Sequence, residues 1–137
     1  MVHQYRHPAA RFLWELPAGV IEPGEDAIGG ALRELAEETG FRASRARSLG
    51  ACYPTPGYCS EVLHFVLAEG LVGGRQHLDP DERVAVRAYS IDDVGAMVGR
   101  GEIADAKTLL AIAWLRGSRN QLLGASSDTM GVGDAVS

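Results

Sequence analysis

The sequence predicts an α/β fold in which a mixed β-sheet is sandwiched between helices. Two observations lead to this prediction: strand-like apolar segments recur along the chain, and segments of helical period stand in its middle and near its end. The chain has 137 residues, of which 46% are hydrophobic and 23% charged, as in an ordinary globular domain. We expect one domain over residues 1–120 and a flexible C-terminal tail over residues 121–137.

Two strands are expected near the N-terminus. Residues 2–5 lead into a turn at residues 6–8, and the apolar-rich residues 11–16 end at the strand-breaking residues 17–19. Later in the chain the pattern predicts a polar connection at residues 44–47, a short strand at 49–53 and a loop at 54–57. A central strand is expected at residues 61–68, a second loop at 69–81 and a strand buried on one face at 84–88.

A helix is expected over residues 27–39. Asp26 is a suitable N-cap, and Gly40 suits the left-handed conformation that follows many helices. Four apolar residues recur at helical spacing and form one face of this helix: Ile28, Ala31, Leu32 and Leu35.

Three carboxylates, Glu34, Glu37 and Glu38, crowd another side of the same helix. Like charges at such spacing destabilise a helix by roughly 0.2–0.5 kcal/mol per pair. Gly29 and Gly30 add a penalty of about 1 kcal/mol each relative to Ala. A helix kept only for stability would avoid these residues, whereas carboxylate oxygens suit a hard divalent cation. For an isolated acidic cluster, the alternative is a solvated face.

Two helices are expected near the C-terminus. Ser90, with Asp93 three residues later, resembles a capping box for a short helix that ends near Gly99. A second helix is expected to follow Asp105 and to end at Gly117. Its predicted buried stripe consists of Ala106, Leu109, Leu110, Ala113 and Trp114.

The composition argues against several classes of partner. The net charge is −5 and the sequence has no basic stripe, so broad nucleic-acid binding is not expected. No apolar run is long enough for a membrane span, and the N-terminus has no signal-peptide pattern. Cys52 and Cys59 are therefore expected to be reduced packing residues of a cytoplasmic protein.

Residues 19–41, GVIEPGEDAIGGALRELAEETGF, match every specified position of the box that defines the Nudix hydrolases. The matching positions are Gly19, Glu25, Arg33, Glu34, Leu35, Glu37, Glu38, Gly40 and Phe41. The chain thus resembles this superfamily. The resemblance implies an α/β/α fold and a loop–helix–loop that holds Mg²⁺ or Mn²⁺ against a diphosphate linked to a nucleoside.

Further segments resemble the ADP-ribose pyrophosphatase subfamily. They are QYRHP at residues 4–8, ELPAG at 15–19, PGYCSE at 56–61 and GEIADAKTLLAIAWL at 101–115. This resemblance implies hydrolysis of the ADP-ribose diphosphate to AMP and ribose 5-phosphate. It also implies a homodimer that pairs through strands preceding the QYR segment. The present chain begins almost at QYR, so either its start is misplaced or it is a shortened form.

The resemblance also assigns the metal site and the catalytic base. It implies that Glu34, Glu38 and the carbonyl of Ala18 ligate the metal, while Glu37 takes a second metal or holds a water. Glu82 stands where the subfamily carries a carboxylate proposed to activate water. A solvent-exposed loop acid is the alternative for Glu82.

The remaining assignments concern positioning and substrate binding. By resemblance, Arg33 clamps box carboxylates such as Glu25 or Glu37. Arg6 is expected to face phosphate or the terminal ribose, with a surface salt bridge as the alternative. Pro56 and Glu61 are assigned to the substrate site, and the alternative for Glu61 is that it only begins a strand.

Alternatives remain open at this point. Trp14 could stack on adenine, although core packing is favoured for it. The substrate could be another nucleotide sugar, a dinucleotide or a damaged nucleotide. A module that binds ADP-ribose without cutting it is the alternative from a different class, but the complete set of box glutamates favours a hydrolase.

Overall fold

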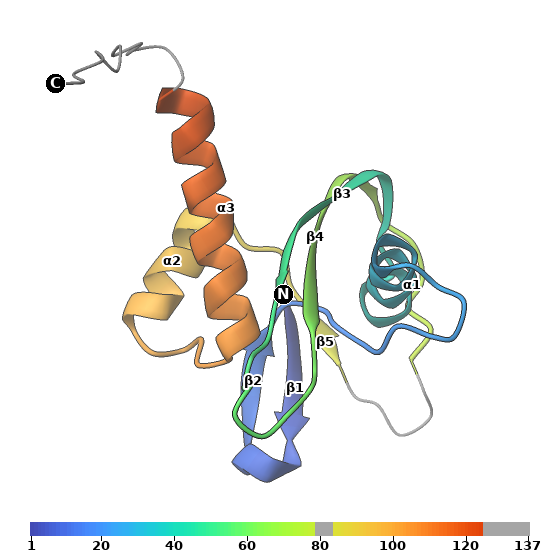
Figure 1. Cartoon of the computed structure of the whole chain (residues 1–137), viewed down its shortest axis with the longest axis horizontal. Helices are drawn as coiled ribbons and strands as arrows, with labels where there is room; N and C mark the ends of the chain where they lie inside the picture. Colours follow the sequence, from blue (N-terminus) through green and yellow to red (C-terminus); the bar gives the residue numbers. More distant parts are fainter. Residues whose placement is uncertain (79–83, 125–137) are drawn as a thin grey trace, which may run out of the picture.

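The computed structural model describes residues 1–78 and 84–124, with side chains up to residue 117. Its strands form a middle layer, with α1 (Ala27–Thr39) on one side and α2 (Ile91–Gly99) and α3 (Ala106–Gly124) on the other (Figure 1). This arrangement confirms the α/β class and its helix–sheet–helix layering. No helix within the described residues is both long and apolar enough to cross a membrane.

Every strand pairing of the described residues is antiparallel, and the strands divide between two sheets. One sheet has the order β2-β1-β5 and consists of β1 (Val2–Arg6), β2 (Arg11–Glu15) and β5 (Ala85–Val86). A 3-10 turn, η1 (His7–Ala9), joins β1 to β2 where the sequence predicted a turn. The other sheet pairs β3 (Arg42–Cys52) with β4 (Leu63–Val72).

The β3–β4 hairpin is longer than the sequence pattern predicted. The expected polar connection at residues 44–47 lies within β3, and the expected loop at 69–81 begins only after β4 ends at Val72. Arg45 pairs with Glu69 in this extension, and both residues are exposed. Hydrophobic periodicity misses such a segment because two-stranded pairing leaves most of its side chains in solvent. The prediction that β4 is a central strand is also wrong. Among the described strands, β4 pairs with β3 alone.

The core lies between the sheets and the C-terminal helices. Val94, Met97, Ile103 and Ile112 form its buried cluster, and Trp14 and Tyr89 pack against it. The Trp14 and Tyr89 rings meet edge to face, with centroids 5.3 Å apart. Core packing of Trp14, which the sequence favoured over adenine stacking, is therefore confirmed. Cys52 is half-buried, but Cys59 is exposed, so the expected packing role is wrong for Cys59.

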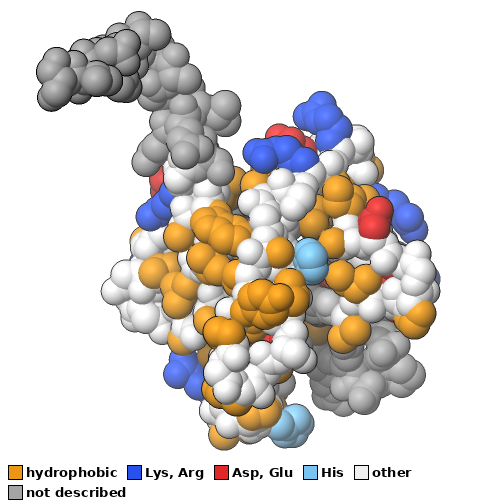
Figure 2. Space-filling view, in the orientation of Figure 1, with side chains coloured by type: hydrophobic (Ala, Val, Ile, Leu, Met, Phe, Trp, Pro, Cys, Tyr) orange, Lys and Arg blue, Asp and Glu red, His pale blue; other side chains and the backbone are white. Residues whose placement is uncertain are grey.

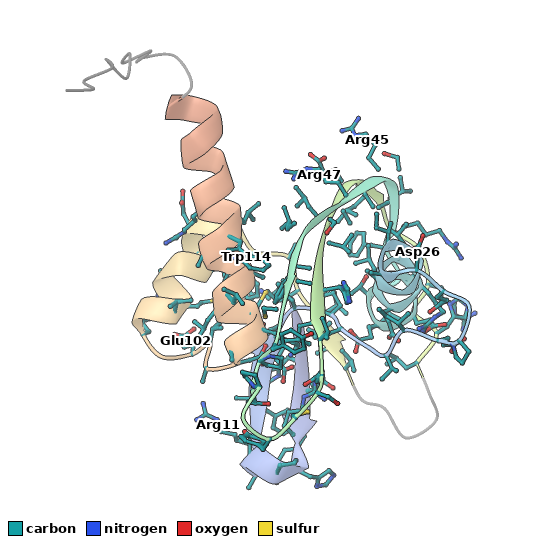
Figure 3. The ribbon with its side chains drawn as sticks, in the orientation of Figure 1. Arg11, Asp26, Arg45, Arg47, Glu102 and Trp114 are labelled. Atoms are coloured by element: carbon teal, nitrogen blue, oxygen red, sulfur yellow. The ribbon has the colours of Figure 1, made fainter. Side chains whose placement is uncertain are left out.

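The last helix differs from its prediction in length and in register. It continues past Gly117 to Gly124, and residues 125–137 of the predicted tail lie outside the described residues. The predicted stripe is wrong for Ala106, Leu109 and Ala113, which are exposed, whereas Leu110 and Trp114 are half-buried. The fully buried residues of the helix are Thr108, Ala111 and Ile112. The helix docks on the end of β2 through a buried threonine, which an apolar pattern cannot reveal. Trp114, labelled in Figure 3, lies on this helix. Its ring packs edge to face on that of Phe65 of β4, with ring centroids 4.9 Å apart.

Large hydrophobic side chains also reach the surface. On the face shown in Figure 2, hydrophobic side chains gather over the middle of the molecule, and most Lys and Arg side chains lie at its edges. Tyr58, in the loop between β3 and β4, is the most exposed of the large hydrophobic residues whose side chains the structure describes. Arg45 and Arg47 lie near the far end of the β3–β4 hairpin (Figure 3).

Candidate functional site

The candidate site is built on α1, which has the predicted bounds, Ala27–Thr39. Asp26 caps its start, because the carboxylate oxygen Oδ1 accepts the N–H of Gly29 at 2.7 Å. Gly40 ends it in the left-handed conformation, with φ of 75°, and donates its N–H to Ala36. Both ends of the helix are thus fixed by local contacts.

The three glutamates of that side differ in their exposure. Glu38 is only 5% exposed, whereas the side chains of Glu34 and Glu37 are 18% and 43% exposed. A purely solvated acidic face is therefore wrong for Glu34 and Glu38. Carboxylates withdrawn from water need compensating partners, and each of the three has them.

Arg33 is the main partner of this cluster. Its Nη1 donates to Glu34 Oε1 at 2.8 Å and to Glu37 Oε2 at 2.9 Å. Its Nε donates to Glu25 Oε1 at 2.9 Å, and its Nη2 to the carbonyl of Val20 at 2.8 Å. The bonds to Glu25 and then to Glu34 raise the pKa of Arg33 well above its ordinary value. The expected clamp on Glu25 and Glu37 is present, and it also includes Glu34.

Glu25 connects the loop before α1 to this clamp. Its Oε2 accepts the backbone N–H of Glu22 at 3.0 Å, and the bonds from Arg33 and Glu22 lower its pKa below the ordinary value. A Cβ at Gly30 would approach Glu25 Oε2 to 3.2 Å and Ile21 Cγ1 to 3.5 Å. The glycine that weakens the helix therefore makes room for the loop to pack on it.

Gly19 also makes room for a neighbouring side chain, that of Glu34. A Cβ at Gly19 would overlap the carboxylate of Glu34, so this carboxylate lies directly against the loop backbone. One residue earlier, the N–H of Ala18 donates to Glu38 Oε2 at 3.1 Å. The structure thus brings Ala18, Gly19, Glu34 and Glu38 together, as the box predicted.

The donor set fits a hard divalent cation by its chemistry. Glutamate carboxylates and a backbone carbonyl are the oxygen ligands that Mg²⁺ and Mn²⁺ favour. Within residues 1–78 and 84–124, no group of three or more His, Cys, Asp or Glu side chains is gathered as a metal cage. Glu34 and Glu37 accept hydrogen bonds from Arg33, and Glu38 accepts one from the N–H of Ala18.

The loop after β4 packs against the C-terminal end of α1. The N–H of His77 donates to the carbonyl of Glu37 at 2.9 Å, and Gln76 Nε2 donates to the carbonyl of Glu38 at 2.6 Å. Gln76 belongs to no sequence motif and is recognised only by its contacts in the structure. Glu82, the predicted catalytic base, lies outside the described residues.

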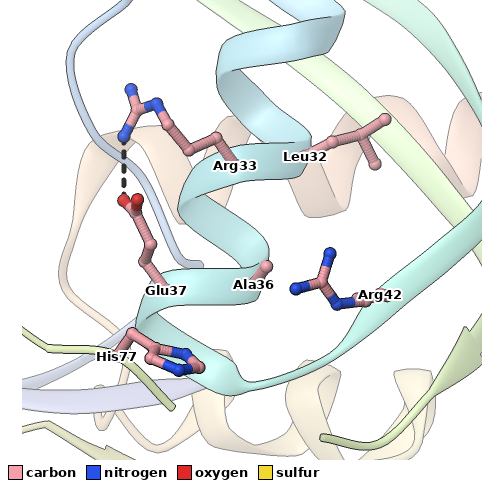
Figure 4. Close-up of a pocket in the computed structure, with 6 residues that line it drawn as sticks. All are labelled: Leu32, Arg33, Ala36, Glu37, Arg42 and His77. Atoms are coloured by element: carbon pink, nitrogen blue, oxygen red, sulfur yellow. Dashed lines mark hydrogen bonds and ion pairs between the residues drawn. The ribbon is translucent and has the colours of Figure 1, made fainter. Parts of the chain in front are cut away.

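A cleft of about 520 Å³ opens beside the outer face of α1. In Figure 4, His77 lies next to Glu37, whose carboxylate is bound to Arg33, and Arg42 faces the same cleft. The lining residues are Leu32, Arg33, Ala36, Glu37, Arg42 and His77. Glu37, the most exposed of the three glutamates, can therefore be reached from this side.

Arg6 makes an ion pair with a buried carboxylate. Its Nε and Nη2 donate to the two oxygens of Glu15 at 2.9 and 2.8 Å, and this bonding raises the pKa of Arg6. A surface salt bridge was the alternative to substrate binding. The salt bridge is present, but its carboxylate is not at the surface, because Glu15 is only 1% exposed. The Arg6 side chain remains 42% exposed.

The other two predicted substrate residues lie on the loop between β3 and β4. Pro56 and Glu61 are both exposed. The only described hydrogen bond of Glu61 is from its backbone N–H to Cys59 Sγ, at 3.5 Å. No described hydrogen bond connects either residue to the glutamates of α1, so their substrate role stays a prediction.

The sequence model of the NUDIX domain matches residues 1–112. The chain belongs to the NUDIX domain family. It is 42% identical over 118 residues to the ADP-ribose pyrophosphatase of Bacillus subtilis, covering 85% of this chain and 64% of that protein. It is 36% identical over 115 residues to the ADP-ribose pyrophosphatase of Mycobacterium tuberculosis, covering 82% and 56%.

A solved structure described as an ADP compounds hydrolase has the same fold as this NUDIX domain. The TM-score is 0.79 at 23% sequence identity, over 91% of this chain and 66% of the other. The likeness shows the NUDIX fold. The chain spans somewhat less than two thirds of the length of the relatives it matches.

Proposed function

We propose that this NUDIX domain hydrolyses the diphosphate of ADP-ribose to AMP and ribose 5-phosphate, using a divalent metal ion. The observation that carries the proposal is the arrangement around Glu38. This carboxylate is withdrawn from water, is joined to the loop at Ala18, and shares a helix with two more glutamates clamped by Arg33. Two ADP-ribose pyrophosphatases to which the chain is similar support this choice of substrate.

Glu34, Glu38 and the carbonyl of Ala18 are the residues that would hold the ion, Mg²⁺ or Mn²⁺, with Glu37 beside them. When bound, the ion neutralises diphosphate charge, orients the substrate and lowers the pKa of a water. Arg33 holds the carboxylates of Glu34 and Glu37 in place between turnovers through its hydrogen bonds to them. The cleft beside Glu37 supplies an approach for solvent to that carboxylate.

The remaining roles are proposed from the family resemblance. Glu82 accepts the proton of the attacking water, and Arg6 contacts a substrate phosphate or ribose. The Arg6–Glu15 pair uses Nε and Nη2, so Nη1 is the nitrogen proposed to contact substrate. Pro56 and Glu61 are proposed to border the substrate. The homodimer and the cytoplasmic location stay predictions.

The test is an assay of the purified chain with ADP-ribose and MgCl₂, with and without EDTA, followed by detection of AMP. We expect AMP only when the divalent ion is present. Glu38→Gln should abolish turnover and keep the thermal unfolding profile, whereas Glu69→Gln, on the exposed part of β4, should leave turnover unchanged. ADP-ribose binding without AMP would refute the hydrolase and favour a binding module. A panel of nucleotide sugars and dinucleotides tests the choice of substrate.

A further inference from the structure

The first turn of α3 contacts the segment that leads into the box. Thr108 is fully buried, and its hydroxyl accepts the N–H of Leu16 at 2.9 Å. The same hydroxyl donates to Asp105 Oδ2 at 2.6 Å. The hydroxyl proton therefore points to Asp105, and the Leu16 N–H uses a lone pair of the hydroxyl oxygen.

A second contact from the same turn fixes the preceding residue. Lys107 Nζ donates to Glu15 Oε2, and Arg6 binds both oxygens of the same carboxylate. Burial of Glu15 works to raise its pKa, but the hydrogen bonds from Arg6 and Lys107 outweigh this effect and lower it. Two adjacent residues, Glu15 and Leu16, are thus held by two adjacent residues of α3.

Only Pro17 separates this anchor from the candidate metal site. The N–H of Ala18 donates to Glu38 Oε2, and Glu38 itself is buried. Proline fixes its own φ and restricts the residue before it to extended conformations. A displacement at Leu16 therefore reaches Ala18 with little backbone freedom to absorb it.

We propose that Thr108 is a positioning residue for metal binding, acting through the backbone of residues 16–18 to place Ala18 against Glu38. The inference rests on the proposed function, in which the Ala18 carbonyl and Glu38 ligate the ion. A purely structural Thr108 would hold α3 on the domain, so its loss would lower thermal stability and leave metal affinity unchanged.

The test compares Thr108→Val with Thr108→Ser in the full chain. Valine keeps the shape of threonine but leaves the Leu16 N–H without its acceptor, whereas serine keeps the hydroxyl. Mn²⁺ affinity is measured without substrate, from the electron paramagnetic resonance signal of free Mn²⁺, and Tm by circular dichroism. We expect Thr108→Val to lower Mn²⁺ affinity about tenfold, as for other residues that orient metal ligands, and Thr108→Ser to restore it.

Ser90→Ala is the matched control. Ser90 caps α2 by accepting the N–H of Asp93 at 3.1 Å, far along the chain from the box. Its loss should lower Tm and leave Mn²⁺ affinity unchanged. Equal Mn²⁺ affinity in Thr108→Val and the wild type would overturn the proposal, whatever happens to Tm.

A second variant covers the case in which Thr108→Val does not fold. Thr108→Ala removes the same hydroxyl with a smaller side chain and should also weaken Mn²⁺ binding; unchanged affinity would overturn the proposal. The titration needs no substrate, so a wild type that binds Mn²⁺ but leaves ADP-ribose intact refutes the proposed function alone. A wild type that binds no Mn²⁺ refutes both.

Discussion

Arg33 and Glu25 are joined by two hydrogen bonds, from Nε to Oε1 at 2.9 Å and from Nη2 to Oε2 at 3.2 Å. This pair ties the loop before α1 to the middle of the helix. The same guanidinium reaches two more carboxylates and the carbonyl of Val20, so one planar group organises both the loop and the acidic side. Lysine has no such fork, and a single ammonium cannot meet these directions at once.

Arg33→Lys is therefore expected to lower kcat/KM for ADP-ribose by about 10–100-fold, as when other groups that orient metal ligands are lost. The measurement is the initial rate of AMP formation across a range of MgCl₂ concentrations. Arg45→Lys is the control, because Arg45 lies exposed on β3 and makes no ion pair among the described side chains. Equal rates for Arg33→Lys and the wild type would contradict the role given to this clamp.

Gly19→Ala tests the contact between the loop and Glu34. The added Cβ would overlap a carboxylate at the end of a flexible side chain, so the fold can adjust while Glu34 is displaced. Displacing a reacting group by about 1 Å can lower a rate about 10²-fold, and we expect a loss of that order with little change in Tm. Gly99→Ala is the control, since a Cβ there would meet nothing within 4 Å. A Gly19→Ala chain with full activity would show that Glu34 need not lie against the loop.

Gly40→Ala tests the close approach between the end of α1 and the loop after β4. Gly40 and Gly101 have similar left-handed conformations, with φ of 75° and 71°. A Cβ at Gly40 would lie 2.7 Å from the carbonyl oxygen of Gly74, whereas one at Gly101 would meet nothing within 4 Å. Both substitutions should cost about 1–2 kcal/mol for the backbone conformation, and Gly40→Ala a further ~1–3 kcal/mol for the overlap. Urea unfolding measures both, and equal losses would argue against this packing.

The acidic helix could be predicted from sequence because its determinants are local. Asp26 and Gly40 mark its ends within a few residues, and both take the expected cap conformations. The box supplied the identities of Glu34 and Glu38, and the structure adds how far each is withdrawn from water. Short-range capping and a fixed motif were sufficient for this part of the site.

The contacts that hold the site to the rest of the domain could not be predicted in this way. Lys107 and Glu15 are 92 residues apart, and a buried ion pair leaves no hydrophobic period. Periodicity instead placed Leu109 in the core, because it gives a buried threonine no weight, and the actual buried face includes Thr108. Gln76 is similar: its amide binds the carbonyl of Glu38 across 38 residues without any motif.

The lowered pKa of Glu15 leads to a specific prediction of how stability depends on pH. Its pKa in the folded chain lies below the ordinary value of 4.5, so its ion pairs contribute fully above pH 4.5, and this contribution is lost as pH falls through the lower folded value. At pH 7, Glu15→Gln should lower the free energy of unfolding by about 3 kcal/mol, because it leaves two cations near a buried neutral group. Urea unfolding at a series of pH values from 7 to 3 should show the difference between wild type and variant shrinking only below pH 4.5.

Glu102→Gln provides the comparison for this series. Glu102 also has a lowered pKa through its bond to Arg100, but both side chains are exposed. Solvent screens such a pair, so its loss should change stability far less than the loss of Glu15 at every pH. A difference for Glu15→Gln that stays constant from pH 7 to pH 3 would mean that its cost is one of packing. A difference that shrinks on acidification, as we expect, would assign that cost to the charges of Arg6 and Lys107 around one buried carboxylate.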